Sequence, residues 1–100
     1  MKYIIQKWEE SERGWGTRPD GFSIHKTDAD RIQYIRNYSK SLPDEAPDEY
    51  SRLDGTPYEV ELTDEQLKEL VGEGNYSFGW RVFSRKYPGD GGPDGWKPVK

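Results

Sequence analysis

The chain has 100 residues, no cysteine and a formal net charge of −4, and 31% of its residues are hydrophobic while 14% are aromatic. This length indicates one domain, and the lack of cysteine excludes disulfides and thiolate metal sites. Large rings therefore have to supply much of the core. No stretch approaches the roughly 20 apolar residues that span a bilayer, so we expect a soluble cytoplasmic protein with no membrane partner.

Two strands are expected before residue 26. Residues 3–8 read as a first strand, and Phe22 and Ile24 alternate with Ser23 and His25 as a short second strand that pairs antiparallel with it. Residues 9–21 are charged and broken by glycines and Pro19, which predicts a long loop. Long loops in small domains are often functional.

A first helix follows. Thr27 is its expected N-cap, Asp28 and Asp30 sit in the first turn, and Pro43 ends it. Residues 43–57 then read as a loop around prolines. The expected buried stripe of the helix consists of Ile32, Ile35, Tyr38 and Leu42.

Residues 57–84 carry the clearest pattern of the chain, a strand, a helix and a strand. Residues 58–62 alternate apolar and acidic side chains, and Thr63 with Gln66 forms a capping box for a helix that ends at Gly72. The helix stripe consists of Leu67, Leu70 and Val71. A last strand is predicted from the period-two apolar set Tyr76, Phe78, Trp80 and Val82, with Gly79 on the opposite side.

The element order β-β-α-β-α-β predicts a small α+β domain over residues 1–87, with a mixed or antiparallel sheet and both helices on one face. Residues 88–100 are rich in glycine and proline and are expected to form a tail. We expect a monomer or a simple dimer.

Negative charge is concentrated in the middle of the chain. Residues 43–74 contain eleven acidic and two basic side chains, a net charge of −9, whereas residues 1–25 sum to 0, residues 26–42 to +2 and residues 75–100 to +3. A field of this kind repels nucleic acid and attracts basic protein surfaces.

No motif points to catalysis, a cofactor or a metal. His25 is the only histidine, and its place on the polar side of a short strand predicts a surface residue. The acidic residues between 44 and 49 lack the ligand spacing of a calcium loop. We therefore assign no catalytic residue and no metal ligand.

The favoured hypothesis is a non-enzymatic protein-binding module that presents its acidic region to a partner with a basic surface, with nucleic acid not expected as a partner. Trp15, between two glycines and near Arg18, either covers the sheet or acts as a binding hot spot. The candidate binding residues are Trp15, Arg18, Asp48, Glu49, Glu59, Glu61, Glu65 and Glu69.

In its small size, acidity and lack of cysteine the chain resembles small proteins of bacteriophages and mobile elements, a group that includes anti-CRISPR and other anti-defence inhibitors. This resemblance implies an inhibitor of a nucleic-acid-binding complex. The stretches at residues 14–21 and 47–52 also resemble small uncharacterised bacterial proteins, which imply no function.

Two alternatives from other classes stay open. A small enzyme would use a site between residues 9–21 and His25, with Arg18 binding an anion and Asp20 or His25 moving a proton. A nucleic-acid-binding domain would use the basic side chains of the first helix and of the end of the last strand. Those side chains are Arg31, Arg36, Lys40, Arg81, Arg85 and Lys86.

Overall fold

The computed structural model describes residues 1–12, 14, 16–43, 49–72 and 74–82. They form a five-stranded antiparallel sheet with two helices, which confirms the α+β class. The predicted domain boundary at residue 87 and the tail after it lie outside this part of the chain. The elements are β1 (Lys2–Glu12), β2 (Gly16–His25), α1 (Asp28–Ser41), β3 (Glu49–Leu53), β4 (Tyr58–Glu61), α2 (Asp64–Val71) and β5 (Trp80–Val82).

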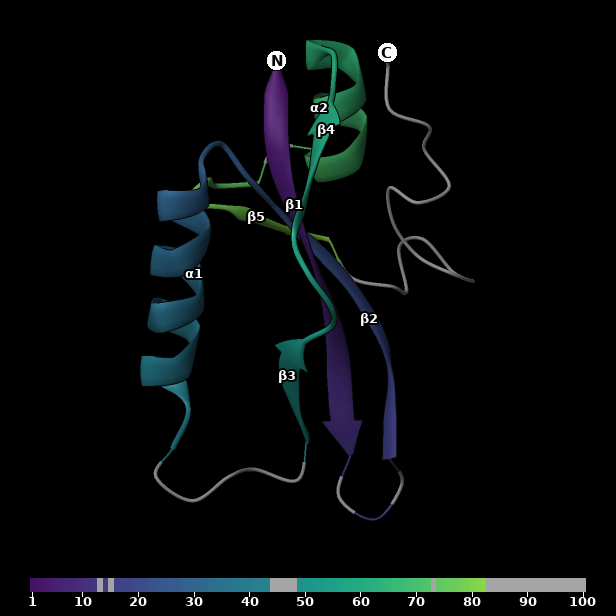
Figure 1. The fold of residues 1–100 in the computed structure, drawn as a ribbon, viewed down its shortest axis with the longest axis vertical. Helices are drawn as coiled ribbons and strands as arrows, with labels where there is room; N and C mark the ends of the chain where they lie inside the picture. The colour runs from purple at the N-terminus through teal and green to yellow at the C-terminus, as the bar shows by residue number, and fades with distance from the viewer. Residues whose placement is uncertain (13, 15, 44–48, 73, 83–100) are drawn as a thin grey trace.

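The long strand β1 is the centre of the sheet. One edge of β1 pairs with β2 over almost its whole length, while its other edge pairs first with β4 and then with β3. The short strand β5 completes the sheet beyond β2. Figure 1 shows α1 to the left of this ribbon of strands and α2 at the top beside β4. None of the helices in the described residues is long and apolar enough to cross a membrane.

The prediction of a loop over residues 9–21 is wrong, because β1 continues to Glu12 and β2 starts at Gly16. These arms carry polar side chains that pair across the hairpin, as in the 2.7 Å ion pair between Arg18 and Glu10. They therefore lack the apolar alternation that marks a strand in a sequence. The turn predicted around Gly21 is a bulge in β2, where Gly21 has a φ of +79°.

The loop expected at residues 43–57 contains a strand as well. β3 pairs with Trp8–Glu12 of β1, and Arg52 Nη2 lies 2.8 Å from Glu9 Oε1. The outer edge of β3 is capped from α1, since the backbone N–H of Ser51 donates to the Tyr38 hydroxyl at 2.8 Å. Its side chains are largely polar, so no periodicity identified it.

The two faces of the sheet differ in chemistry, and α2 covers the apolar one. Alternation along β1 and β2 places Tyr3, Ile5, Phe22 and Ile24 on this face. The predicted stripe of α2 packs onto them, with Leu70 fully buried. The Thr63–Gln66 capping box is present, so the sequence prediction for this helix is confirmed.

The opposite face is polar and aromatic, and α1 covers it. Gln6, Trp8 and His25 lie on this face, where the rings of Tyr34 and Tyr38 meet the Trp8 ring edge to face. The helices therefore lie on opposite faces, and the sequence expectation of one shared face is not met.

The stripe of α1 differs from the expected one for the same reason. Tyr34 and Tyr38 face the sheet beside Arg31, whose side chain is 15% exposed, whereas Ile32 is 39% exposed. A helix that packs on a polar and aromatic face buries rings and amphipathic side chains, and apolar periodicity does not select those.

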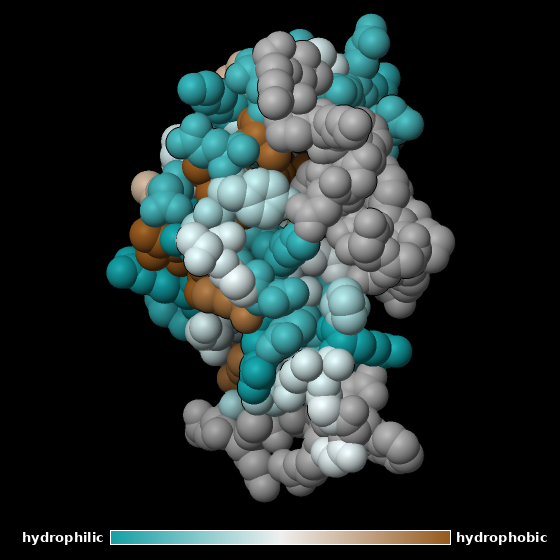
Figure 2. Space-filling model, turned by 45° about the vertical axis from the view of Figure 1, so that its right-hand side comes forward, coloured by the Kyte–Doolittle hydropathy of each residue, from teal (hydrophilic) through white to brown (hydrophobic). Residues whose placement is uncertain are grey.

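The predicted last strand is much shorter than its apolar pattern, because β5 starts only at Trp80. Tyr76, Ser77 and Phe78 form a turn in which Ser77 and Phe78 have φ values of +34° and +68°. Phe78 is 43% exposed. On the face of the molecule shown in Figure 2, hydrophilic side chains cover most of the described surface and hydrophobic ones form small separate areas.

Candidate functional site

A chain of hydrogen bonds runs under α1 from Trp8 to the turn before β5. Trp8 Nε1 donates to Ser23 Oγ at 2.8 Å, Ser23 Oγ lies 2.7 Å from His25 Nε2, and His25 Nδ1 lies 2.8 Å from the Phe78 carbonyl oxygen. A carbonyl oxygen only accepts, so Nδ1 carries the imidazole proton and Nε2 accepts from the Ser23 hydroxyl. Each side-chain polar atom in this row of hydrogen bonds therefore has a partner.

The expectation that His25 lies on the surface is wrong, because its exposed fraction is 0%. Residues 23 and 25 face α1, and the Tyr34 ring meets the imidazole at 5.1 Å between centroids. The sequence shows a polar residue on the polar side of a strand, and nothing local indicates that a helix covers that side. Desolvation by burial lowers the pKa of His25, and the charge of Arg31 lowers it further.

Ser23 and His25 have the spacing of a nucleophile and its base. Both are 0% exposed, however, so a substrate does not reach the Ser23 hydroxyl in this structure. The other groups of the enzyme alternative are engaged as well, since Arg18 pairs with Glu10 and Asp20 pairs with Arg81. The hydrogen bonds from Trp8 through Ser23 and His25 to Phe78 connect β1, β2 and the turn before β5.

The burial of His25 predicts a pH dependence of stability. Its folded-state pKa lies below its unfolded value of about 6.5, so the unfolded chain binds more protons as the pH falls below that value. The free energy of unfolding should then decrease by up to about 1.4 kcal/mol per pH unit. Urea unfolding between about pH 7 and about pH 5.5 measures this, above the range where carboxylates titrate.

His25→Gln is the control for the pH dependence, because glutamine has no charge to gain. Its baseline stability should be lower than that of the native chain, while its free energy of unfolding should stay nearly flat over the same pH range. An equal decrease in both proteins would assign the dependence to other groups.

The turn that closes over His25 is anchored to the start of α1. The Tyr76 hydroxyl donates to the Asp30 carboxylate and accepts from the backbone N–H of Lys26 at 3.0 Å. Burial and the bond to Asp30 raise the pKa of Tyr76 to about 12. The Lys26 ammonium lies 4.5 Å from the centre of the Tyr76 ring. The hydroxyl and the ring of Tyr76 together hold the turn against the start of α1.

Arg81, on β5, is hydrogen-bonded to residues of β2 and β3 and packs against the Trp8 ring. Its Nη2 donates to Asp20 Oδ2 at 3.2 Å, to the Asp20 carbonyl at 3.0 Å and to Ser51 Oγ at 3.2 Å, and its guanidinium lies 4.5 Å from the centre of the Trp8 ring. Its side chain is only 12% exposed. This basic residue of the nucleic-acid alternative is therefore part of the interior.

The remaining described basic residues of that alternative lie on α1 and differ in their partners. Arg31 bonds Asp28 and the buried Gln6, while Arg36 and Lys40 are exposed on α1. Arg85 and Lys86 lie outside the described residues.

The predicted acidic binding residues fall on two sides of the sheet. Glu59 and Glu61 pair in register with Ile4 and Lys2, so they lie on the side of α1. Glu65 and Glu69 are exposed on α2, which packs on the opposite face. The two pairs follow one another along β4 and α2 but do not share one face of the sheet.

The other predicted binding residues lie toward the hairpin end or outside the description. Arg18 is exposed and held by Glu10. The backbone of Glu49 belongs to β3, but its side chain is not described. Trp15 and Asp48 lie outside the described residues.

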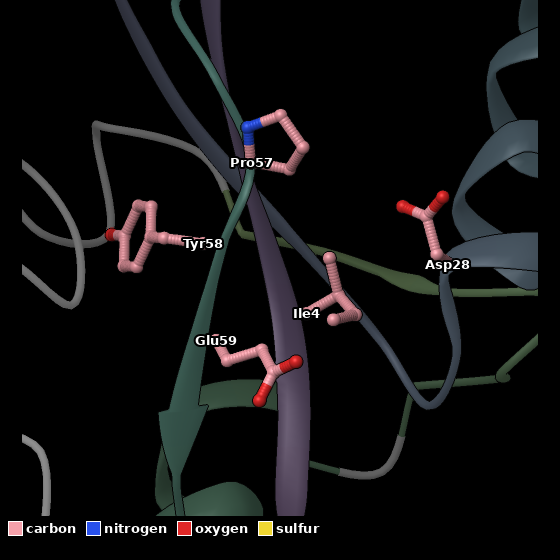
Figure 3. Close-up of a pocket in the computed structure, with 5 residues that line it drawn as sticks. All are labelled: Ile4, Asp28, Pro57, Tyr58 and Glu59. Carbon is pink, nitrogen blue, oxygen red and sulfur yellow. The ribbon is translucent and has the colours of Figure 1, made fainter.

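A shallow pocket of about 250 Å³ lies between the start of α1 and the β4 edge. It is lined by Ile4, Asp28, Pro57, Tyr58 and Glu59. Figure 3 shows the carboxylates of Asp28 and Glu59 on opposite sides of Ile4, while the Tyr58 ring points away. Sequence reasoning found Glu59 but missed Asp28 as its neighbour, because no local signal relates a helix N-terminus to a strand some 30 residues later.

Among the described residues, no group of three or more histidine, cysteine, aspartate or glutamate side chains is placed to hold a metal ion. Searches with this chain found no matching protein-family model, curated protein or solved structure.

Proposed function

We propose that this chain is a non-enzymatic protein-binding module whose acidic segment, residues 58–71, binds a basic surface of a partner protein. The observation that carries the proposal is the exposure of Glu59, Asp64, Glu65 and Glu69 along β4 and α2. Lys68 is the single basic residue of this segment. Carboxylates placed so attract cationic surfaces and speed their association.

The apolar core of this segment is formed by other side chains. The buried side chains of the segment are Val60, Leu62 and Leu70, which pack into the apolar core. Asp64 and Glu65 lie in the first turn of α2, where the helix dipole favours acidic side chains, whereas Glu65 and Glu69 lie one helical turn apart, where like charges destabilise a helix by roughly 0.2–0.5 kcal/mol. The support for a binding role is therefore the exposure of these carboxylates to solvent.

The partner class follows from the charge. A protein that binds nucleic acid carries lysine and arginine side chains where phosphates lie. An acidic module docked there would compete with the nucleic acid, which is the inhibitory role we propose for this surface.

The test measures binding of a fluorescent octalysine peptide by anisotropy, at low and at moderate salt. The native chain should bind, and more weakly as salt screens the charges. Changing Glu59, Glu61, Glu65 and Glu69 to glutamine should weaken binding about fourfold or more, since each exposed pair contributes roughly 0.2–1 kcal/mol.

A charge-matched control neutralises Glu9, Glu10, Glu12 and Asp54, so that both variants reach the same net charge. This control should bind octalysine nearly as the native chain does. Equal weakening in both variants would show that net charge alone attracts the peptide, and the proposed binding segment would be wrong.

A further inference from the structure

We propose that the pocket between Asp28 and Glu59 receives one lysine side chain of the basic partner. This inference rests on the proposed function and adds to it the group that is recognised and the place where it binds.

The size of the pocket fits one side chain. Its volume of about 250 Å³ lies below the roughly 300–1,000 Å³ of sites for small molecules. It is also open to solvent along the β4 edge, so a side chain that projects from a partner surface can enter it directly. A free metabolite in this open pocket would contact the protein on too few sides to be bound.

The lining matches the two halves of a lysine side chain. Ile4 and Pro57 offer apolar surface to the methylene stem, which long basic side chains commonly bury while the charged end stays in a polar environment. Asp28 and Glu59 stand on either side of Ile4, so the pocket offers a carboxylate from α1 on one side and another from β4 on the other.

The two carboxylates differ in how they are held. Asp28 Oδ1 accepts from Arg31 Nε at 2.7 Å, and Arg31 Nη1 donates in turn to the Oε1 of the fully buried Gln6 at 3.1 Å. Asp28 is thus fixed in place before any partner binds. The structure gives Glu59 no hydrogen bond or ion pair within the residues it describes, so its carboxylate is available to a cation.

The same geometry selects lysine over other cations. An arginine fork binds best to both oxygens of one carboxylate, and one oxygen of Asp28 is already taken by Arg31. A divalent metal prefers more oxygen ligands than two separated carboxylates provide. A compact ammonium on a flexible stem pairs with a single carboxylate oxygen and does not need the two-oxygen geometry of an arginine fork.

The experiment is a titration of the 15N-labelled chain with the capped peptide Gly-Gly-Lys-Gly-Gly, followed by amide chemical shifts. Shifts should concentrate at Ile4, Asp28, Tyr58 and Glu59. The peptide with norleucine in place of lysine keeps most of the stem without the charge and should shift these amides much less, and the arginine peptide should bind more weakly than the lysine peptide.

Glu59→Gln should weaken the lysine peptide about two- to fivefold, the range of one exposed ion pair. Glu10→Gln is the matched control, because it removes the same charge from the β1–β2 hairpin outside the binding segment, and it should leave the affinity unchanged. Equal shifts with norleucine, or equal affinity in Glu59→Gln, would overturn the lysine pocket.

Failure of this inference is distinguishable from failure of the proposed function. If the lysine peptide leaves the pocket amides unmoved while octalysine still binds through residues 58–71, the pocket assignment is wrong and the acidic module stands. If octalysine also fails to bind, both are wrong.

Discussion

Replacing Trp8 with alanine is expected to lower the free energy of unfolding by about 3–5 kcal/mol, the range for truncating a buried aromatic side chain. Trp8 is 2% exposed, and its ring contacts Tyr34, Tyr38 and the Arg81 guanidinium. Its removal leaves a cavity under α1 and takes the Nε1 donor from Ser23. For a domain of this size the loss is comparable to the whole stability.

Trp80→Ala is the comparison for Trp8, because Trp80 is only partly buried and its Nε1 donates to the Gly74 carbonyl at the surface. Urea unfolding of the two variants should show a clearly smaller loss for Trp80. If too little Trp8→Ala folds to be measured, the milder variants Trp8→Phe and Trp80→Phe replace the alanine pair. Trp8→Phe should lose more unfolding free energy than Trp80→Phe. The reverse order would mean that the face under α1 contributes little to stability.

Gly79→Ala is expected to cost about 2–4 kcal/mol, through overpacking and a lost buried hydrogen bond. A Cβ at Gly79 would lie 2.4 Å from His25 Nδ1 and 2.6 Å from its Cε1. The imidazole is enclosed by Tyr34 and bonded on both nitrogens, so it has no free direction in which to move. The methyl group would therefore separate His25 from the Phe78 carbonyl.

Gly74→Ala is the matched control, five residues earlier in the same connection. A Cβ there would lie 3.4 Å from the Val71 carbonyl oxygen and 3.7 Å from the Trp80 ring, so it meets ordinary contacts. Its unfolding free energy should change by less than about 1 kcal/mol. A similar loss in both variants would show that the connection tolerates no side chain at all, and His25 would not be the cause.

Local signals in the sequence predict both helix starts. Thr27 accepts from the backbone N–H of Asp30, and Thr63 forms its reciprocal bonds with Gln66. Capping of this kind depends on residues three positions apart, so it can be recognised from the sequence without knowledge of the fold. The apolar stripe of α2 was predictable for the same reason.

Features that depend on distant residues were not predictable. The arms of the β1–β2 hairpin are strands because charged side chains pair across them, as Arg18 does with Glu10. His25 is buried because α1 crosses over it and because its Nδ1 meets the carbonyl of Phe78, 53 residues later. The sequence pattern placed Gly79 opposite the apolar set, but only the contact with His25 explains why glycine stands there.

The candidate site is predictable to a similar extent. Alternation along β4 placed Glu59 on the wet side of a strand, and it is exposed. The position of Glu65 and Glu69 on the other side of the sheet follows from where α2 packs, and the nearness of Asp28 to Glu59 follows from where α1 begins. Both depend on tertiary packing.

The most direct test of the proposed function is an amide chemical-shift map of the native chain with octalysine. We predict shifts concentrated along β4 and α2, including Glu59, Glu65 and Glu69, with little change at Arg18 in the hairpin. Shifts centred on the hairpin, or spread evenly over the surface, would contradict the assignment of residues 58–71 as the binding surface.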